Sequence, residues 1–294
     1  MKKSTRRTMM MSSLAMLLVA VLALGTATYA WFTASSTGKV QNIQFSATSA
    51  DGISISFTGM PGTYKSTLDF TEWDSSDVVL SPVSAHNPVA GNTFKFFSGF
   101  FNEGDNTITT SEVNLASGNY IAMPLYIYNS GENDITVYLS DAEVAAIGNI
   151  RTDAATRVGI VSYAGSVDYS ELNSESNPET LITGYSTSFI YEPVPNYHLE
   201  SGIENATYYG IVAEQSHAAT TGSNNHIVVN TETAASNTAT TTVYECNSNN
   251  TRMLTIGGGK VMKVMVYIWI EGQDIDCFNG IASGTVKIDL HFAK

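Results

Sequence analysis

The most compact group of side chains that could do chemistry lies near the C-terminus, where Glu271, Asp274 and Asp276 fall close together. Carboxylates spaced along a loop can ligate a hard cation such as calcium. The segment lacks the length and glycine placement of an EF-hand loop, and a solvated acidic turn explains it equally well. These residues are the only metal candidates that the sequence offers, and we expect no cofactor.

Enzyme motifs are otherwise missing from the sequence. No nucleophile elbow or phosphate loop is present, because Gly257-Gly258-Gly259-Lys260 lacks the upstream glycine and the following hydroxyl residue. That segment predicts a flexible turn into a strand. A zinc-protease motif needs two histidines four residues apart, and no pair has this spacing among His86, His198, His217, His226 and His291. We therefore expect no catalytic residues and a protein that is not an enzyme.

The chain has two cysteines, Cys246 and Cys277, which excludes a disulfide-dense scaffold and a four-cysteine zinc site. In an exported protein they could form one disulfide. Two separate thiols are the alternative, because distance along the sequence says nothing about distance in space.

Charge also limits the possible partners. The formal net charge is −13, with 14 basic and 27 acidic residues. Four of the basic residues precede residue 8, so ten remain after them against 27 acids, a formal charge of −17. Such a surface repels nucleic acid and anionic membranes and favours solubility. We expect no nucleic-acid partner and only transient contact with a membrane.

The first thirty residues have the three parts of a secretory signal peptide. Basic residues come first, an apolar run of eleven follows at 14–24, and Thr28-Tyr29-Ala30 provides small residues around a larger one. We predict cleavage between Ala30 and Trp31. The competing interpretation is an uncleaved membrane anchor, since no charge occurs between Arg7 and Lys39.

Side chains that alternate between apolar and polar dominate the rest of the chain and predict half-buried strands. Ile43, Phe45 and Ala47 precede the turn signal Asp51-Gly52, after which the alternation resumes at 53–57. Residues 120–128 and 135–139 repeat this arrangement around a second turn. We predict a β-hairpin at each turn.

The two C-terminal strands give the clearest pattern. At 263–271 both faces are apolar, which predicts a central strand covered on both sides. At 285–292 the apolar residues all share one face, so we expect that face inside and the other in water: Val286, Ile288, Leu290 and Phe292 inside, Lys287, Asp289 and His291 outside.

These elements predict an all-β fold, an antiparallel β-sandwich of jelly-roll type with at most one or two short helices besides the signal helix. One short helix is expected at 141–150. Residues 31–294 form a single domain in this interpretation. A Ser/Thr/Asn/Tyr-rich insertion occupies about 165–250, either as an exposed loop region or as a surface for partners.

The segment from Gly25 to Thr33 resembles the cleavage region of the SipW-dependent class of exported Gram-positive proteins, the family of TasA and the camelysins. Aromatic residues stand on both sides of the predicted cut, although Thr33-Ala34 replaces the acidic residue of many relatives. Arg157–Ile160 and the run from Val266 to Cys277 are similar to segments of uncharacterised members. The resemblance reaches about half of the chain and leaves the 165–250 region unmatched.

The resemblance implies a secreted or cell-surface structural protein of a biofilm matrix that associates with itself or with other matrix or surface proteins. In such proteins the mature N-terminal segment can add a strand to the next subunit; here the donor would be 31–47, with Ile43 and Phe45 as anchors. The same strand could instead close its own sandwich. Two alternatives remain open: an adhesin or glycan-binding sandwich that uses the 165–250 region, and a camelysin-like secreted metalloprotease.

Overall fold

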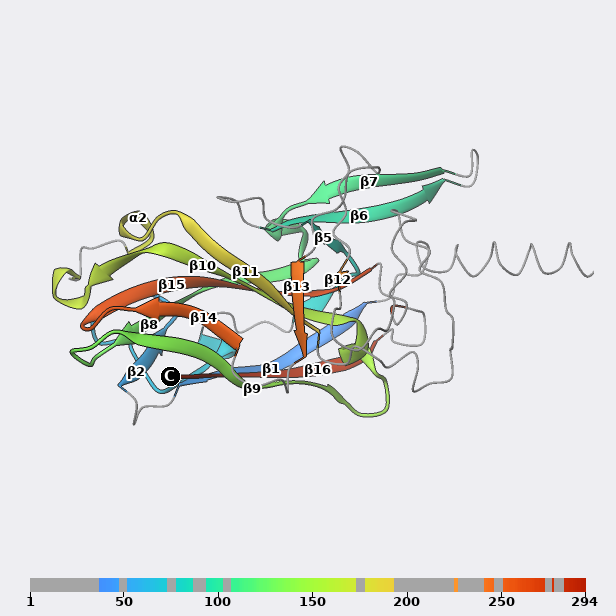
Figure 1. Ribbon diagram of the computed structural model, residues 1–294. Coiled ribbons are helices and arrows are strands. Elements are labelled where there is room, and N and C mark those ends of the chain that lie inside the picture. The colour runs from blue at the N-terminus through green and yellow to red at the C-terminus, as the bar shows by residue number, and fades with distance from the viewer. Residues whose placement is uncertain are drawn as a thin grey trace, which may run out of the picture.

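The computed structural model describes residues 37–47, 52–72, 78–86, 94–102, 107–172, 178–192, 225–226, 241–245, 251–272, 277 and 283–294. Within them the protein is a sandwich of two β-sheets, with a third, smaller sheet over part of one outer face (Figure 1). The predicted all-β sandwich is confirmed.

The first sheet, sheet A, has six strands in the order β14-β9-β16-β1-β3, with β4 also paired to β1. Neighbouring strands are antiparallel except for β1 and β16, which run parallel. Its strands are β1 (Gly38–Ala47), β3 (Thr67–Asp69), β4 (Val78–Leu80), β9 (Ile135–Ile147), β14 (Thr251–Ile256) and β16 (Thr285–Ala293).

The second sheet, sheet B, has seven strands in the order β12-β13-β11-β10-β15-β8-β2. Only the β11–β13 pair is parallel. The strands are β2 (Ile53–Ser56), β8 (Tyr120–Asn129), β10 (Thr156–Asp168), β11 (Tyr185–Glu192), β12 (Asn225–His226), β13 (Thr241–Glu245) and β15 (Lys260–Ile270).

The third sheet, sheet D, is antiparallel and lies on the side of sheet B that faces away from sheet A in Figure 1. It has the order β5-β6-β7, with β5 (Ser84–His86), β6 (Lys95–Asn102) and β7 (Thr107–Val113). Helical structure in the described part of the chain is brief. It comprises α2 (Pro178–Leu181) and the 3₁₀ turns η2 (Phe70–Glu72), η3 (Leu115–Ser117), η4 (Thr152–Ala155) and η5 (Tyr169–Glu171).

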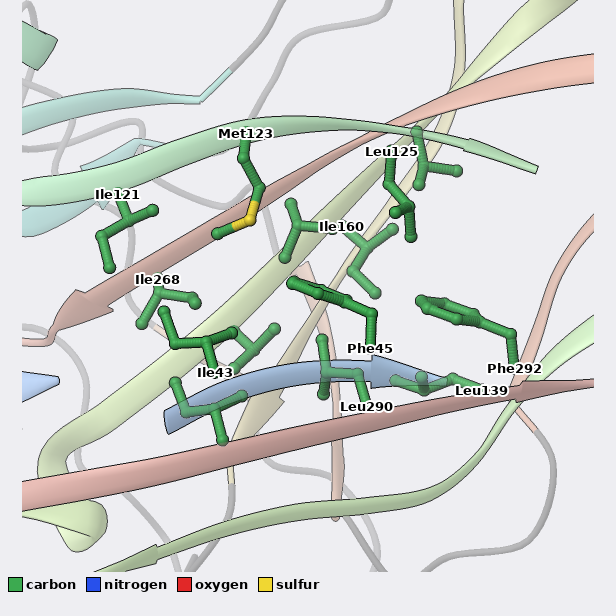
Figure 2. Close-up of a cluster of buried hydrophobic side chains, with 14 of the residues drawn as sticks. Ile43, Phe45, Ile121, Met123, Leu125, Leu139, Ile160, Ile268, Leu290 and Phe292 are labelled. Carbon is green, nitrogen blue, oxygen red and sulfur yellow. The ribbon is translucent and has the colours of Figure 1, made fainter. Parts of the chain in front are cut away.

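The main core lies between sheets A and B. Figure 2 shows side chains from β1, β9 and β16 pointing toward side chains from β8, β10 and β15. Along β16 buried and half-buried residues alternate without a break, which confirms the predicted inward face of Val286, Ile288, Leu290 and Phe292. The apolar face of one strand therefore meets that of another, and this burial is the main stabilising term.

β15 is the central strand that its sequence predicts. It pairs with β10 on one side and β8 on the other. Val264, Val266 and Ile268 enter the main core, while Tyr267 and Trp269 are buried on the opposite face of sheet B. A strand with two dry faces favours apolar residues on both, and this explains the continuous hydrophobic run from Val264 to Ile270.

Both predicted hairpins are wrong. β1 belongs to sheet A and β2 to sheet B, and the next predicted pair, β8 and β9, is likewise divided between the two sheets. The described turn between β8 and β9 connects strands across the sandwich rather than within one sheet. Alternation shows that each strand has one buried face, which holds for either arrangement.

The Asn129 side chain binds two of the connections that run from one sheet to the other. Its Nδ2 donates to the carbonyl oxygens of Asn133, Ile256 and Gly257 at 2.8, 3.2 and 3.1 Å. The β8–β9 and β14–β15 connections are thereby held together. A Cβ at Gly258 would lie within 2.1 Å of the Glu132 carbonyl oxygen, so the glycine-rich turn predicted there is required by close backbone packing.

The short helix predicted at 141–150 is also wrong, because β9 continues to Ile147 as a strand. Pairing with β16 overrides the helix propensity of its alanines. Val144 is buried in the main core, and the Glu143 carboxylate accepts from the Lys287 ammonium at 3.1 Å on the outer face.

The predicted 165–250 insertion overlaps several ordered elements. It begins inside β10 and includes α2 and β11, and β11 pairs directly with β10 in sheet B. Most of 193–250 lies outside the described residues.

Candidate functional site

The first described strand lies within sheet A rather than at its edge. β1 pairs in parallel with β16 along almost its whole length, and its other side pairs with β3 and β4. The first described strand thus runs beside the last one (Figure 1). The surrounding strands form a slot that β1 fills, which we call the β1 slot.

A β-bulge sets which side chains of β1 point inward. The register against β16 shifts between Gln41 and Ile43, so one extra residue is inserted there. Val40 before the bulge, and Ile43, Phe45 and Ala47 after it, are consequently all buried in the main core. A regular strand would have turned Val40 outward, because side chains alternate faces.

The entry to β1 is tightly packed. A Cβ at Gly38 would lie 2.6 Å from Ile270 Cδ1 and 2.7 Å from Thr152 Cγ2, so only glycine fits without a shift. The Lys39 amide donates to the Gly284 carbonyl oxygen at 2.8 Å. These contacts fix where β1 begins beside β16.

Ile43 and Phe45, the predicted anchors of a donor strand, occupy the centre of this core. Both are at most 1% exposed, and the Phe45 ring meets the Phe57 ring edge to face at a centroid separation of 5.6 Å. Figure 2 shows them beside Leu290 and opposite Ile268 and Met123. In the structure of the single chain, β1 therefore closes its own sandwich.

Glu271, one of the metal candidates, is buried at the end of β15. Its Oε2 accepts from Trp269 Nε1 at 3.0 Å and from the Ala85 amide at 3.4 Å. The backbone is also held, since the Glu271 amide donates to the Ala155 carbonyl oxygen at 2.8 Å. The carboxylate joins β15 to β5 and compensates for burial of the indole N–H. Asp274 and Asp276 lie outside the described residues.

An aromatic layer surrounds Trp269 between sheets B and D. Phe96 stacks on Tyr120 at 4.0 Å and meets Trp269 at 5.4 Å, and Phe94 lies 5.3 Å from Tyr267. Such ring pairs add to the stabilisation from area burial alone. The layer attaches sheet D to the outer face of sheet B.

Lys263 is the one buried cation of β15. It is 5% exposed, and its Nζ lies 3.0 Å from Glu179 Oε1 on α2. The same ammonium stands 4.8 Å from the ring centroid of Tyr163 and 5.8 Å from that of Tyr126. A carboxylate and two ring faces thus replace part of the water that the ammonium loses.

The tyrosines around this ammonium form a third buried cluster with Ile182, Val167 and Leu172. Burial is the main reason that the pKa values of Tyr64, Tyr126 and Tyr163 are well above the usual range. Neighbouring tyrosines add to the effect at Tyr64, and the hydrogen bond that the Tyr163 hydroxyl donates to Tyr185 adds to it at Tyr163. These phenols therefore stay protonated above the pH at which a solvated tyrosine ionises.

The other predicted site residues lie largely beyond the described part of the chain. Cys277 is described and buried at 4% exposure, but Cys246 is not described, so their disulfide stays a prediction. The predicted cleavage position, Ala30 and Trp31, and the signal helix also lie outside the described residues.

Sequence reasoning missed the Lys263–Glu179 pair. One signal was available, because Lys263 is the only charge between Lys260 and Glu271 in a strand assigned two dry faces. A lysine at such a position requires a carboxylate or aromatic partner. Nothing in the sequence indicates which acid supplies it.

The described residues contain neither a metal-binding cluster nor a membrane-spanning helix. No group of three or more histidine, cysteine, aspartate or glutamate side chains there could hold a metal ion. No described helix is long and apolar enough to cross a membrane.

The fold defines the chain as an all-β protein with a two-sheet sandwich and an attached third sheet. Comparison with models of protein families, with curated proteins and with solved structures gives no match.

Proposed function

We propose that this chain is an exported structural protein of the cell surface or extracellular matrix that assembles with itself by strand addition. The position of β1 carries the proposal, because the N-terminal strand fills a slot in the sheet and its neighbours do not adjoin it in sequence. The leader-like N-terminus and the acidic composition support export and solubility before assembly.

Exchange of β1 between copies conserves every contact that it makes. The bulge, the four inward side chains and the pairing with β16 are properties of the sequence, so β1 of one copy fits the slot of another. Val40, Ile43 and Phe45 each contribute about 1.5–3 kcal/mol on burial and Ala47 contributes less, in its own slot or a neighbour's. The balance between the two forms then depends on protein concentration and on strain in the segment after β1.

Repeated exchange in one direction makes a chain of subunits. Each copy gives β1 to the next and receives β1 from the one before, which is a head-to-tail contact that need not close. A fibre follows from this geometry without any new surface. The slot also gives specificity, since a donor must place apolar side chains on both sides of a bulge.

A reversible covalent lock tests the proposal. Ser46 pairs with Thr67 across the antiparallel β1–β3 contact, and both side chains reach solvent. Directly opposed residues of this kind have Cα atoms about 4.5–5.5 Å apart, within the range that a disulfide spans. In the mature chain from Trp31, Ser46→Cys with Thr67→Cys should tie β1 to its own sheet.

Negative-stain electron microscopy gives the readout. We expect the oxidised double variant to form no fibres, and to form fibres after a reductant opens the disulfide. Each single cysteine variant is the matched control and should form fibres in both conditions. Fibres from the oxidised double variant, with mass spectrometry showing that the 46–67 disulfide lies within each single chain, would refute strand exchange.

Deletion of residues 31–46 gives a second test. The truncated chain retains the slot but cannot donate, so it should form no fibres and should end fibres of the intact mature protein when mixed with it. Undiminished fibre formation by the truncated chain alone would dispose of the proposal.

A further inference from the structure

Sheet D ends in a strand whose second side meets no other described strand. β7 pairs with β6 over all seven of its residues, from Thr107 opposite Asn102 to Val113 opposite Phe96, with no shift in register. A regular edge strand presents a row of backbone donors and acceptors that another strand can pair with.

The other edge strands of the described sheets are short or irregular. β2 has four residues, β3 has three and β12 has two. β14 has six, but its pairing with β9 is broken by a register shift between Arg252 and Leu254. Short strands, bulges and cationic residues are the usual means by which proteins prevent pairing at an edge.

β7 has none of these protective features. Its sequence, TITTSEV, contains no proline and no lysine, and Thr, Ile and Val favour strands. Its single charge, Glu112, lies 3.5 Å from the Lys95 ammonium of β6. The strand is therefore the longest regular edge in the described structure and carries little charge to repel a copy of itself.

The rest of sheet D holds this edge in place. The Val83 amide, just before β5, donates to the Ile270 carbonyl oxygen, and the Gly272 amide donates to that of Val83. Phe96 and Val113 pack into the aromatic layer around Trp269. In Figure 1 β6 and β7 extend along the side away from the main sandwich. The edge is thus presented by an anchored sheet rather than by a loose hairpin.

We propose that β7 pairs antiparallel with β7 of a second copy of this chain, joining two sheets D into one six-stranded sheet. The register with full overlap places Thr110 opposite its own copy and Glu112 opposite Ile108 of the second copy. The two glutamates are then not directly opposed, which avoids the like-charge repulsion that destabilises cross-strand pairs. The contact is two-fold and closed, so it is separate from the head-to-tail exchange of β1 and does not depend on it.

The test uses the oxidised Ser46→Cys, Thr67→Cys chain, in which exchange of β1 is blocked. We expect analytical ultracentrifugation to show a monomer–dimer equilibrium. Thr110→Lys and Thr110→Glu place like charges face to face, and each should raise the dimer dissociation constant about tenfold or more, equivalent to about 1.4 kcal/mol. An equimolar mixture of these two variants places opposite charges together and should restore the dimer.

Thr255→Lys, an exposed threonine changed on the edge strand β14, is the matched control and should leave the equilibrium unchanged. Circular dichroism confirms that each variant keeps its strand content. A locked chain that stays monomeric up to about 1 mM, or a mixture no more associated than its components, would overturn the pairing. If the β1 proposal fails, only fibre formation is affected, so its failure is distinguishable from failure of the β7 pairing.

Discussion

The buried ammonium of Lys263 gives a quantitative prediction, because the two members of its ion pair with Glu179 can be changed separately. The perturbation is Glu179→Gln, which keeps the shape of the side chain and removes its charge. Lys263 is almost completely buried, whereas the Glu179 side chain is 60% exposed. Only one member of the pair is therefore strongly screened by water.

The magnitude follows from the geometry. Two unit charges 3.0 Å apart interact by about 5 kcal/mol at an effective dielectric constant of 20. Solvent around Glu179 reduces this, and the rings of Tyr126 and Tyr163 keep part of the stabilisation when the carboxylate is gone. We expect Glu179→Gln to lower the free energy of unfolding by about 1–2 kcal/mol.

Lys263→Met behaves differently, because methionine fills similar space and brings no charge into the sheet. Replacing a buried ion by an apolar side chain is often neutral. We expect a change within about 1 kcal/mol, and no further loss when Glu179→Gln is added. The double-mutant cycle should thus give a coupling of about 1–2 kcal/mol.

Urea unfolding followed by tryptophan fluorescence measures these changes. Glu112→Gln is the matched control, since its ion pair with Lys95 is more than half exposed on both sides, and it should change stability by less than about 0.5 kcal/mol. A neutral Glu179→Gln, or additive effects in the double variant, would show that the ammonium does not depend on this carboxylate.

Three further predictions concern other parts of the fold. Phe45→Ala should lower the free energy of unfolding by about 3–5 kcal/mol in a thermal or urea titration, because the ring is fully buried between the sheets; a loss below about 1 kcal/mol would contradict its central position. Asn129→Ala should cost about 1–3 kcal/mol, since three carbonyl oxygens lose their donor, and wild-type stability would show that the two connections are held otherwise. Burial raises the pKa of Tyr64, Tyr126 and Tyr163 in the folded chain, so their stabilisation is complete below about pH 10, the unfolded pKa, and declines as the pH rises above it. Absorbance at 295 nm should show that fewer than the 15 tyrosines of the chain ionise while it is folded and that the rest ionise only as it unfolds, and ionisation of all 15 at full folded circular dichroism would refute their burial.

The sequence predicts a strand and its buried faces where each face lies wholly in water or wholly in the protein interior. β16 has one wet and one dry face, and β15 has two dry faces, so their sequences record their positions directly. The same alternation could not reveal which sheet a strand joins, because β1 and β2 bury one face whether they form a hairpin or cross the sandwich. The parallel pairing of β1 with β16 is equally invisible in sequence, since it joins the two ends of the described chain.

The candidate site was predictable in part. Ile43 and Phe45 stood out as anchors, but the bulge that also turns Val40 inward depends on pairing with β16. Glu271 looked like a loop carboxylate, and its role in accepting from Trp269 follows only from the layer that sheet D places over sheet B. The helix propensity of residues 141–150 led to a wrong prediction, because pairing with the neighbouring strand determines their backbone conformation.

Whether β1 fills the slot of a neighbouring copy can be measured directly by mixing two single variants. One mature chain carries Ser46→Cys and the other Thr67→Cys, so no chain can close this disulfide alone. After assembly and oxidation, exchange predicts covalent dimers that contain one chain of each kind, seen by mass spectrometry and absent when either variant is assembled by itself. Fibres whose chains never cross-link between positions 46 and 67 would contradict the account.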